Sequence, residues 1–223
     1  MEQLTIKALY QDLDQTLAKS LLESKTYPWE VLPLIHDMIL EIGKNLSLDE
    51  YEQVADDIWI AKSAKVAKSA FIQGPAIIGK EAEVRHCAFI RGNALVGDGA
   101  VVGNSTELKN VILFNKVQVP HYNYVGDSIL GYAAHMGAGS ITSNVKSDKT
   151  LVTIKVGDEQ IETGIKKVGA MLGDYVEVGC GSVLNPGTIV GAYSNIYPLS
   201  MTRGYIKAHS IYKKQGEVVA KSE

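Results

Sequence analysis

The spacing of the hydrophobic positions changes once along the chain, near position 58. Before that point aliphatic residues recur at helical spacing, as with Ile35 and Ile39. Ser47 has Glu50 three residues later, which is the pattern of a capping box and predicts a further helix there. We therefore expect residues 1–57 to form a small N-terminal helical arm of short helices.

From Ile60 the hydrophobic period is six residues, which neither a helix nor a simple strand produces. The hexad positions hold Ile60, Val66, Ile72, Ile78, Val84, Ile90, Val96, Val102 and Leu108. An alanine follows each of the first seven, four positions later, where a small inward side chain is needed. Hexads predict short strands that meet at corners, about three hexads to a coil, with coils stacked by parallel pairing. The predicted fold class is mainly β, a parallel β-helix whose hand the pattern alone leaves open.

The hexads are interrupted twice by one-residue slips, after Leu108 and after Val125, and then by a longer segment. Residues 143–167 carry no hexads, and the pattern there predicts an inserted hairpin with a Gly-Asp turn. Hexads resume at Leu172 and end near Ile196. The expected organisation is a helical arm over 1–57, a β-helix over 58–204 with an excursion loop over 143–167, and a C-terminal cap or tail over 205–223.

Composition narrows the classes of function. The chain has 223 residues, 46% of them hydrophobic, and a formal net charge of −3. That charge gives no reason to expect nucleic acid or an anionic membrane as partner. The N-terminus carries acidic residues and no long apolar run, so we expect no signal peptide, no membrane span and a cytoplasmic protein.

The cysteines and histidines do not have metal-ligand spacing. Cys87 and Cys180 lie far apart, and we expect both to be buried reduced thiols. Hexapeptide-repeat carbonic anhydrases bind zinc through three histidines, but here Gly126 follows His121 at the position where a second ligand would be needed. We therefore expect no metal site.

Coil counting brings two pairs of residues together. Arg91 and Lys109 are 18 residues apart, so both should project from the same corner of adjacent coils, either as solvated charges or as a clamp for a phosphate. His121 and Ala138 are 17 apart across one slip, so Ala138 should lie directly over His121. A small residue beside an outward histidine leaves room for a ligand.

The segment from Arg91 to Asn144 resembles a known family, the acetyltransferase domain of the bacterial bifunctional enzymes that make UDP-N-acetylglucosamine. The residues that carry the likeness are "NSTELK", then His121 twelve residues after its lysine, then "HYNYVGD" and "MGAGSITSN". About 145 residues follow the general hexapeptide plan, and about 55 carry these motifs. The resemblance implies a left-handed β-helix.

The resemblance also implies roles for individual residues. His121 would be the general base that takes a proton from a sugar amine, and Asn144 would orient the reactants. The residues implied for the sugar phosphate are Arg91, Lys109, Tyr124 and His135. The backbone N–H near Ala138 would meet the thioester carbonyl, and the further residues implied for acetyl-CoA are Lys149, Cys180 and Pro198.

Four departures from the family are visible. His135 stands where the family usually has an asparagine, and Pro198 where it usually has an alanine. The 143–167 excursion is longer than usual and resembles that of archaeal-type sugar-1-phosphate acetyltransferases. The nucleotidyltransferase domain of the bifunctional relatives is replaced by 57 residues without a Gly-rich phosphate loop, so we do not expect nucleotidyl transfer.

We therefore expect an acetyl-CoA-dependent N-acetyltransferase that acts on glucosamine 1-phosphate or galactosamine 1-phosphate. The family likeness implies a homotrimer, with the arm capping one end or lying over a neighbour. Three alternatives stay open at this point. They are acyl transfer to another amine or a hydroxyl, a non-catalytic sugar-nucleotide-sensing scaffold, and a nucleotidyltransferase-associated module that needs a partner chain.

Overall fold

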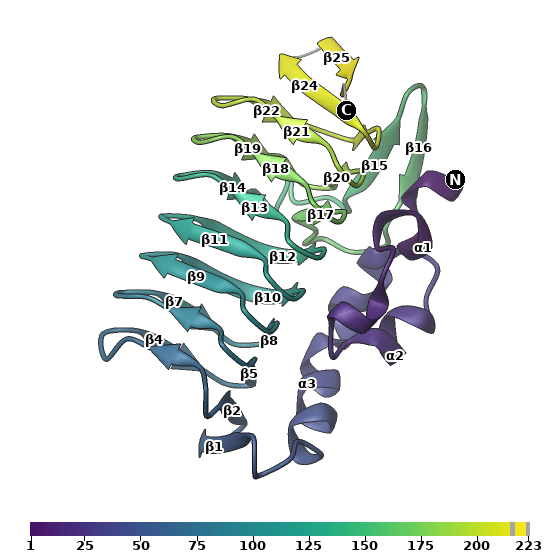
Figure 1. Ribbon diagram of the computed structural model, residues 1–223. Coiled ribbons are helices and arrows are strands. Elements are labelled where there is room, and N and C mark those ends of the chain that lie inside the picture. Colours follow the sequence, from purple (N-terminus) through teal and green to yellow (C-terminus); the bar gives the residue numbers. More distant parts are fainter. Residues whose placement is uncertain (215–216, 222–223) are drawn as a thin grey trace.

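The hexads fold into stacked coils with a helical arm along one side (Figure 1). This computed structural model describes residues 1–214 and 217–221. It confirms the predicted fold class, a left-handed parallel β-helix of hexapeptide repeats with a helical arm and an inserted hairpin.

The arm consists of short α-helices alternating with 3-10 helices. Their bounds are η1 Glu2–Leu4, α1 Ile6–Leu9, η2 Leu13–Gln15, α2 Lys19–Glu23, η3 Pro28–Leu34 and α3 Ile35–Lys44. The capping-box prediction at Ser47 is wrong, because residues 48–50 form a turn and β1 (Tyr51–Ala55) is a strand. β1 pairs antiparallel with β2 (Ile58–Ala61), so it covers backbone groups that would otherwise be left open on the first coil.

Each full coil presents three faces, which we name after a residue or element on them. The His121 face holds β3 Lys65–Val66, β6 Glu83–Val84, β9 Val101–Asn104, β11 Gln118–His121, β13 His135–Met136, β18 Glu177–Val178, β21 Asn195–Ile196 and β24 Ser210–Lys214. The Tyr124 face holds β4 Phe71–Gln73, β7 Phe89–Arg91, the first halves of β10 Glu107–Leu113 and β12 Tyr124–Leu130, then β14 Ile141–Thr142, β19 Val183–Leu184 and β22 Met201–Thr202. The arm face holds β2, β5 Ala76–Ile78, β8 Ala94–Val96, the second halves of β10 and β12, then β17 Ala170–Leu172, β20 Thr188–Val190 and β23 Tyr205–Ile206.

The pairing register confirms the predicted slips. Leu108 pairs with Ile90 at an offset of 18 residues but Val111 pairs with Ala94 at 17, which shows the first slip. Gln118 pairs with His135 at an offset of 17 across the second slip. β10 and β12 each turn a corner at a residue with positive φ, Asn110 at 54° and Asp127 at 48°. Asparagine and aspartate tolerate that conformation better than most residues with a side chain.

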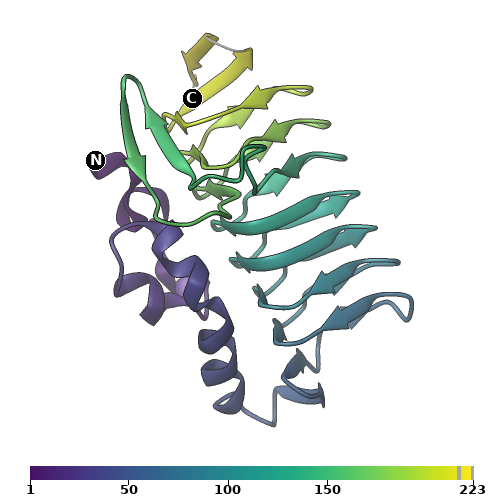
Figure 2. The ribbon, with the colours of Figure 1, turned by 180° about the vertical axis from the view of Figure 1, so that it is seen from behind.

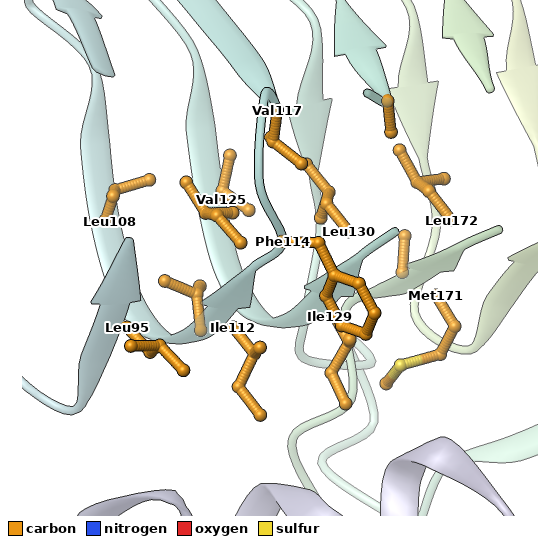
Figure 3. Close-up of a cluster of buried hydrophobic side chains, with 14 of the residues drawn as sticks. Leu95, Leu108, Ile112, Phe114, Val117, Val125, Ile129, Leu130, Met171 and Leu172 are labelled. Carbon is orange, nitrogen blue, oxygen red and sulfur yellow. The ribbon is translucent and has the colours of Figure 1, made fainter. Parts of the chain in front are cut away.

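The arm face carries a second row of apolar side chains on the outside of the coils. Figure 3 shows Leu95, Ile112, Ile129 and Met171 on the side of the strands toward the helices, opposite the inward Leu108, Val125 and Leu130. All four outward residues are fully buried. The arm packs over this row, with α3 against β5, β8 and β10, and η3 against β12. The arm therefore lies along its own β-helix, and the expectation that it caps an end or covers a neighbour is wrong.

The excursion continues this cover toward the C-terminal coils (Figure 2). It contains the predicted hairpin, with β15 (Thr153–Val156) antiparallel to β16 (Glu159–Glu162). Val152 and Ile154 are fully buried, and a Cβ on Gly187 would lie 2.9 and 3.3 Å from their side chains. The hairpin thus covers coils that the arm does not reach.

The chain ends in an antiparallel hairpin of β24 and β25 (Glu217–Ala220), and β24 continues the stack by pairing with β21. Of the tail expected over 205–223, residues 215–216 and 222–223 lie outside the described residues. Within the described part of the chain, no helix has the length and apolar character needed to cross a membrane.

Candidate active site

The residues expected at the acyl-donor site form one column on the His121 face. Gln118 pairs with His135 and His135 with Glu177, so the same offsets place Ala138 beside His121 and Cys180 beside Ala138. The backbone bonds agree, since the Gly139 N–H donates to the His121 carbonyl at 3.0 Å and the Gly181 N–H to the Ala138 carbonyl at 2.9 Å. The predicted position of Ala138 is confirmed.

Pro198 extends this column by one more coil. Glu177 pairs with Asn195, and the Leu199 N–H donates to the Cys180 carbonyl at 2.9 Å. We call the set of His121, Ala138, Cys180 and Pro198 the His121 column. The three residues that follow His121 in this column are an alanine, a cysteine and a proline, so none of them has a long side chain.

His121 has an exposed side chain at the end of β11. Its own N–H donates to the Asn123 side-chain oxygen at 3.1 Å, which fixes the backbone at the following turn. Asn123 is buried and also donates to the carbonyls of Gly137 and Ser140, so this turn is tied to the next coil. Among the described residues the imidazole has no hydrogen-bond partner, and both ring nitrogens are available to a substrate.

The Ala138 N–H is a free donor as well. In the described part of the chain it has no hydrogen-bond partner, whereas the N–H groups of Gly137 and Gly139 are both bonded. A free backbone N–H beside an exposed histidine is suited to stabilise negative charge on an oxygen.

Arg91 and Lys109 lie in adjacent coils of the Tyr124 face, as the sequence predicts, since Leu108 pairs with Ile90 immediately before them. Each cation is already paired. Arg91 donates to Glu107 at 2.6 Å, a bond that raises the pKa of Arg91, and Lys109 donates to Asp127 at 3.1 Å. The four formal charges cancel, so a phosphate bound here would share the two cations with two carboxylates.

Tyr124 and Asn144 meet over Gly126. The Asn144 amide donates to the Tyr124 hydroxyl at 3.2 Å and also to the Asp127 carboxylate. A Cβ on Gly126 would lie 2.5 Å from the Tyr124 hydroxyl oxygen and 3.0 Å from the Asn144 amide nitrogen, so only glycine leaves room for this contact. Burial, with a smaller contribution from Asp127, raises the pKa of Tyr124, which therefore keeps its proton near neutral pH.

His135 and Lys149 lie outside these two groups. His135 is on the His121 face, three residues before Ala138, and its Nδ1 is 2.7 Å from the Glu177 carboxylate. Lys149 lies in the excursion loop with a φ of 58°, and its N–H donates to the Lys146 carbonyl. No hydrogen bond or ion pair among the described residues joins either side chain to His121.

A cavity of about 690 Å³ lies beyond Asn144 on the same face of the coils. Its lining includes Lys146, Asp148, Asn185 and Arg203. Sequence reasoning missed Arg203, because a single arginine near the end of the hexads carries no signal until the register places it two coils beyond Ser143.

Sequence reasoning also missed Glu107, Asn123 and Asp127, although all three lie inside the motifs quoted above. The two cysteines correct another expectation. Cys87 and Cys180 are free but exposed, because Cys87 sits at an outer corner with a φ of 59° and Cys180 points outward from its coil. The described residues contain no group of three or more His, Cys, Asp or Glu side chains arranged to hold a metal ion.

Two curated relatives match about half of the chain. A bifunctional sugar-1-phosphate nucleotidylyltransferase/acetyltransferase of Sulfurisphaera tokodaii is 35% identical over 97 residues, which is 44% of this chain and 24% of that protein. The bifunctional protein GlmU of Methanococcus aeolicus is 33% identical over 122 residues, 55% of this chain and 29% of that protein. The chain thus spans under a third of the length of these relatives.

Among solved structures, the polySia specific acetyltransferase NeuO matches 75% of this chain and 88% of its own, at 11% identity and a TM-score of 0.45. The acetyltransferase domain of PglB from Neisseria gonorrhoeae FA1090, in complex with acetyl coenzyme A, matches 70% of this chain and 53% of its own, at 17% identity and a TM-score of 0.35. We draw nothing further from likenesses this distant.

Two matches extend over most of the chain. The family model described as the GMPPB C-terminal domain matches residues 72–197. The uncharacterized acetyltransferase YaiX of Escherichia coli O6:K15:H31 is 32% identical over 183 residues, 76% of this chain and 80% of that protein. The chain therefore belongs to the hexapeptide-repeat acetyltransferases, and its β-helix belongs to the family described as the GMPPB C-terminal domain.

Proposed function

We propose that this protein transfers the acetyl group of acetyl-CoA to the amine of an amino-sugar 1-phosphate, either glucosamine 1-phosphate or galactosamine 1-phosphate. The observation that carries the proposal is the His121 column. It combines an exposed histidine with no side-chain partner among the described residues, a free backbone N–H at Ala138, and the compact side chains of Cys180 and Pro198 in the next two coils.

In this proposal acetyl-CoA lies along the His121 column. The thioester carbonyl accepts a hydrogen bond from the Ala138 N–H, and the CoA arm runs past Cys180 and Pro198. Lys149 is proposed to meet a CoA phosphate. Support for a donor of this kind comes from the relatives, whose names include acetyltransferases.

The acceptor binds around the corner at residues 122–123, against the Tyr124 face. Tyr124 and Asn144 contact the sugar there, whereas His135 stays outside these contacts, because it pairs with Gln118 at the end of β11 away from this corner. His121 takes one proton from the ammonium form of the acceptor, and the neutral nitrogen attacks the thioester carbon. The C–S bond then breaks, the departing CoA thiolate takes up the proton held by His121 and leaves as the thiol, and the amide nitrogen releases its second surplus proton to water.

Arg91 and Lys109 bind the sugar phosphate only if the phosphate shares them with Glu107 and Asp127. Because this cluster is neutral without a ligand, the geometry also supports a second candidate, acyl transfer to an amine or hydroxyl of a sugar without a 1-phosphate. For either acceptor we propose a homotrimer in the cytoplasm, with no metal requirement.

A panel of acceptors tests the proposal. Free CoA is measured after mixing the protein with acetyl-CoA and glucosamine 1-phosphate, galactosamine 1-phosphate, or the same two amino sugars without phosphate. We expect turnover that requires the 1-phosphate. Turnover that is equal without the phosphate would favour the second candidate, and no turnover with any amino sugar would refute acetyl transfer to this class.

A further inference from the structure

Asp127 is a buried carboxylate at the corner between the Tyr124 face and the arm face. The residue is 4% exposed and has a φ of 48°. An ionised carboxylate held away from water is costly unless donors surround it. The donors around Asp127 show what the residue holds in place.

Three side chains from the two coils on either side of Asp127 converge on this carboxylate. Lys109 donates to its two oxygens at 3.1 and 3.4 Å, and Asn110 donates to it at 3.0 Å. Asn144 donates to it from the following coil. Two of these donors, Lys109 and Asn144, are residues that we assign to the acceptor site.

The contact reaches a third acceptor-site residue indirectly. The Asn144 amide that donates to Asp127 also donates to the Tyr124 hydroxyl at 3.2 Å. The Asp127 carboxylate therefore orients Lys109 and Asn144 directly, and it orients Tyr124 through Asn144. Asp127 itself is covered by these groups, so it has no open side toward a substrate.

The same carboxylate is joined to the helical arm. The Asn110 amide that donates to Asp127 also donates to the Leu32 carbonyl at 3.2 Å. A cavity of about 280 Å³ at this junction is lined by Leu32 and Pro33 of the arm, Asn110, Asp127 and residues 165–167 at the end of the excursion. The Gly169 N–H, just after the excursion, donates to the Asp127 carbonyl at 2.8 Å.

We propose that Asp127 is a positioning residue that holds Lys109, Asn144 and, through Asn144, Tyr124 in the geometry the acceptor needs. Asn110 links this carboxylate to the arm, so that docking of the arm helps to set the acceptor site. The effect on turnover rests on the proposed function, whereas the effect on side-chain placement does not.

Asp174 is the matched control. It is also a buried aspartate, 2% exposed, and it also joins a coil to the arm, accepting from the Tyr132 N–H at 2.8 Å and the Gln11 N–H at 2.7 Å. It contacts none of the residues assigned to the site. A purely structural role for Asp127 predicts that the two aspartates behave alike.

The test compares Asp127→Asn with Asp174→Asn in steady-state kinetics and in crystal structures. The asparagine amide would face the Asn110 and Asn144 amides, so we expect Asp127→Asn to lower kcat/KM for the acceptor by about tenfold to a hundredfold. KM for acetyl-CoA should stay within about twofold, because the His121 column makes no contact with Asp127. Asp174→Asn should keep both parameters after correction for the folded fraction.

Equal losses in the two variants, or a rise in KM for acetyl-CoA as large as the loss for the acceptor, would overturn the proposal. If Asp127→Asn does not fold, Asn110→Gly replaces it, because glycine keeps the positive φ and removes only the amide. That variant should lower kcat/KM for the acceptor and leave KM for acetyl-CoA unchanged. Unchanged acceptor kinetics in Asn110→Gly would overturn the link to the arm.

The crystal structures give a result that does not depend on activity. Lys109 and Asn144 should leave their positions in Asp127→Asn and keep them in Asp174→Asn. If the wild type turns over no acceptor, the proposed function fails, and these structures still decide whether Asp127 positions the two side chains. Side chains that stay in place would refute the positioning role.

Discussion

The candidate acceptor site has no free space for a side chain at position 126, which is a glycine. The Tyr124 ring folds over it, and the Asn144 amide approaches from the next coil. A methyl group there overlaps the Tyr124 hydroxyl, so either the ring or the amide must move. The absence of a side chain at Gly126 thus allows the contact between Tyr124 and Asn144.

We predict that Gly126→Ala lowers kcat/KM for the acceptor by about tenfold or more, because misplaced contacts cost orientation. KM for acetyl-CoA should change little. The control is Gly164→Ala, where an added Cβ meets nothing within 4 Å but the φ is 74°. The control should lose about 1–2 kcal/mol of stability from that backbone conformation and keep its kinetics. Wild-type acceptor kinetics in Gly126→Ala would contradict the assigned site.

At the residue scale, the sequence predicts which residues lie side by side better than it predicts which charged side chains form ion pairs. Counting hexads and slips is enough to put Ala138 beside His121 and Lys109 beside Arg91, because stacked coils leave little freedom of register. The ion partners Glu107 and Asp127 were not foreseen, because a pairing depends on where side chains point after a corner. Those two carboxylates change the predicted clamp into a neutral cluster.

The helical arm is the element whose role the structure changes most. Its hydrophobic stripe covers an outward row that includes Leu95, Ile112 and Ile129, all fully buried. The hexad pattern places Val96, Leu113 and Leu130 inward, and it does not by itself reveal that their neighbours are covered as well. The signal in the sequence that points to such cover is a large aliphatic residue directly before the inward residue of every third hexad, such as Leu95 before Val96.

This packing predicts that Ile112→Ala is strongly destabilising although the side chain points out of the coil. We expect a loss of roughly 2–5 kcal/mol in the free energy of unfolding, as for a core substitution. Val54→Ala should cost about 0.5 kcal/mol or less, because Val54 is 49% exposed. Chemical denaturation of both variants measures the difference, and similar small losses would mean that the arm does not pack on this face in solution.

Asp174 also joins the arm to the coils, because its carboxylate accepts from the Gln11 N–H, and we expect its contribution to folding stability to depend on pH. Burial raises the pKa of Asp174 above its ordinary value, so the folded state holds this proton more tightly than the unfolded chain does. The stabilising effect of that proton is present below the unfolded pKa and is lost as pH rises through the folded pKa. We predict that the wild type loses stability relative to Asp174→Asn as pH rises from below the ordinary aspartate range. A difference that is constant with pH, or that grows in the opposite direction, would contradict this.

At the scale of the whole molecule, the arm and the hairpin leave two faces of the β-helix uncovered by their own chain. Exposed apolar side chains gather there, with Phe71 62% exposed and Met201 58% exposed on the Tyr124 face. Tyr122 and Leu199 at the adjoining corner are 65% and 85% exposed. Exposed apolar side chains on faces that the chain itself does not cover are available for contacts between subunits.

We predict that the protein is a homotrimer that packs through these two faces. Light scattering after gel filtration should give three times the chain mass of 24.1 kDa. A Phe71→Glu substitution should shift the mass downward, whereas Val54→Glu should not. A monomer at micromolar concentration in the wild type would contradict the proposed assembly.

The coiled architecture was predictable from the sequence, because the hexad period repeats over most of the chain and excludes other folds. The place of the arm was not, because an amphipathic arm can bury its stripe against any apolar surface. The separation of the proposed acyl-donor column on one face from the proposed acceptor group on the next was also not foreseen. It depends on the corner at Tyr122, where the chain passes from one face to the other.

The most direct test of the central claim is acetyl transfer by the wild type and by His121→Ala with an amino-sugar 1-phosphate. Acetyl-CoA binding is measured by calorimetry on the same samples. We predict turnover by the wild type, a fall in kcat of about a hundredfold or more in His121→Ala, and nearly unchanged affinity for acetyl-CoA. Full activity in His121→Ala would contradict the account, and so would a wild type that binds no acetyl-CoA.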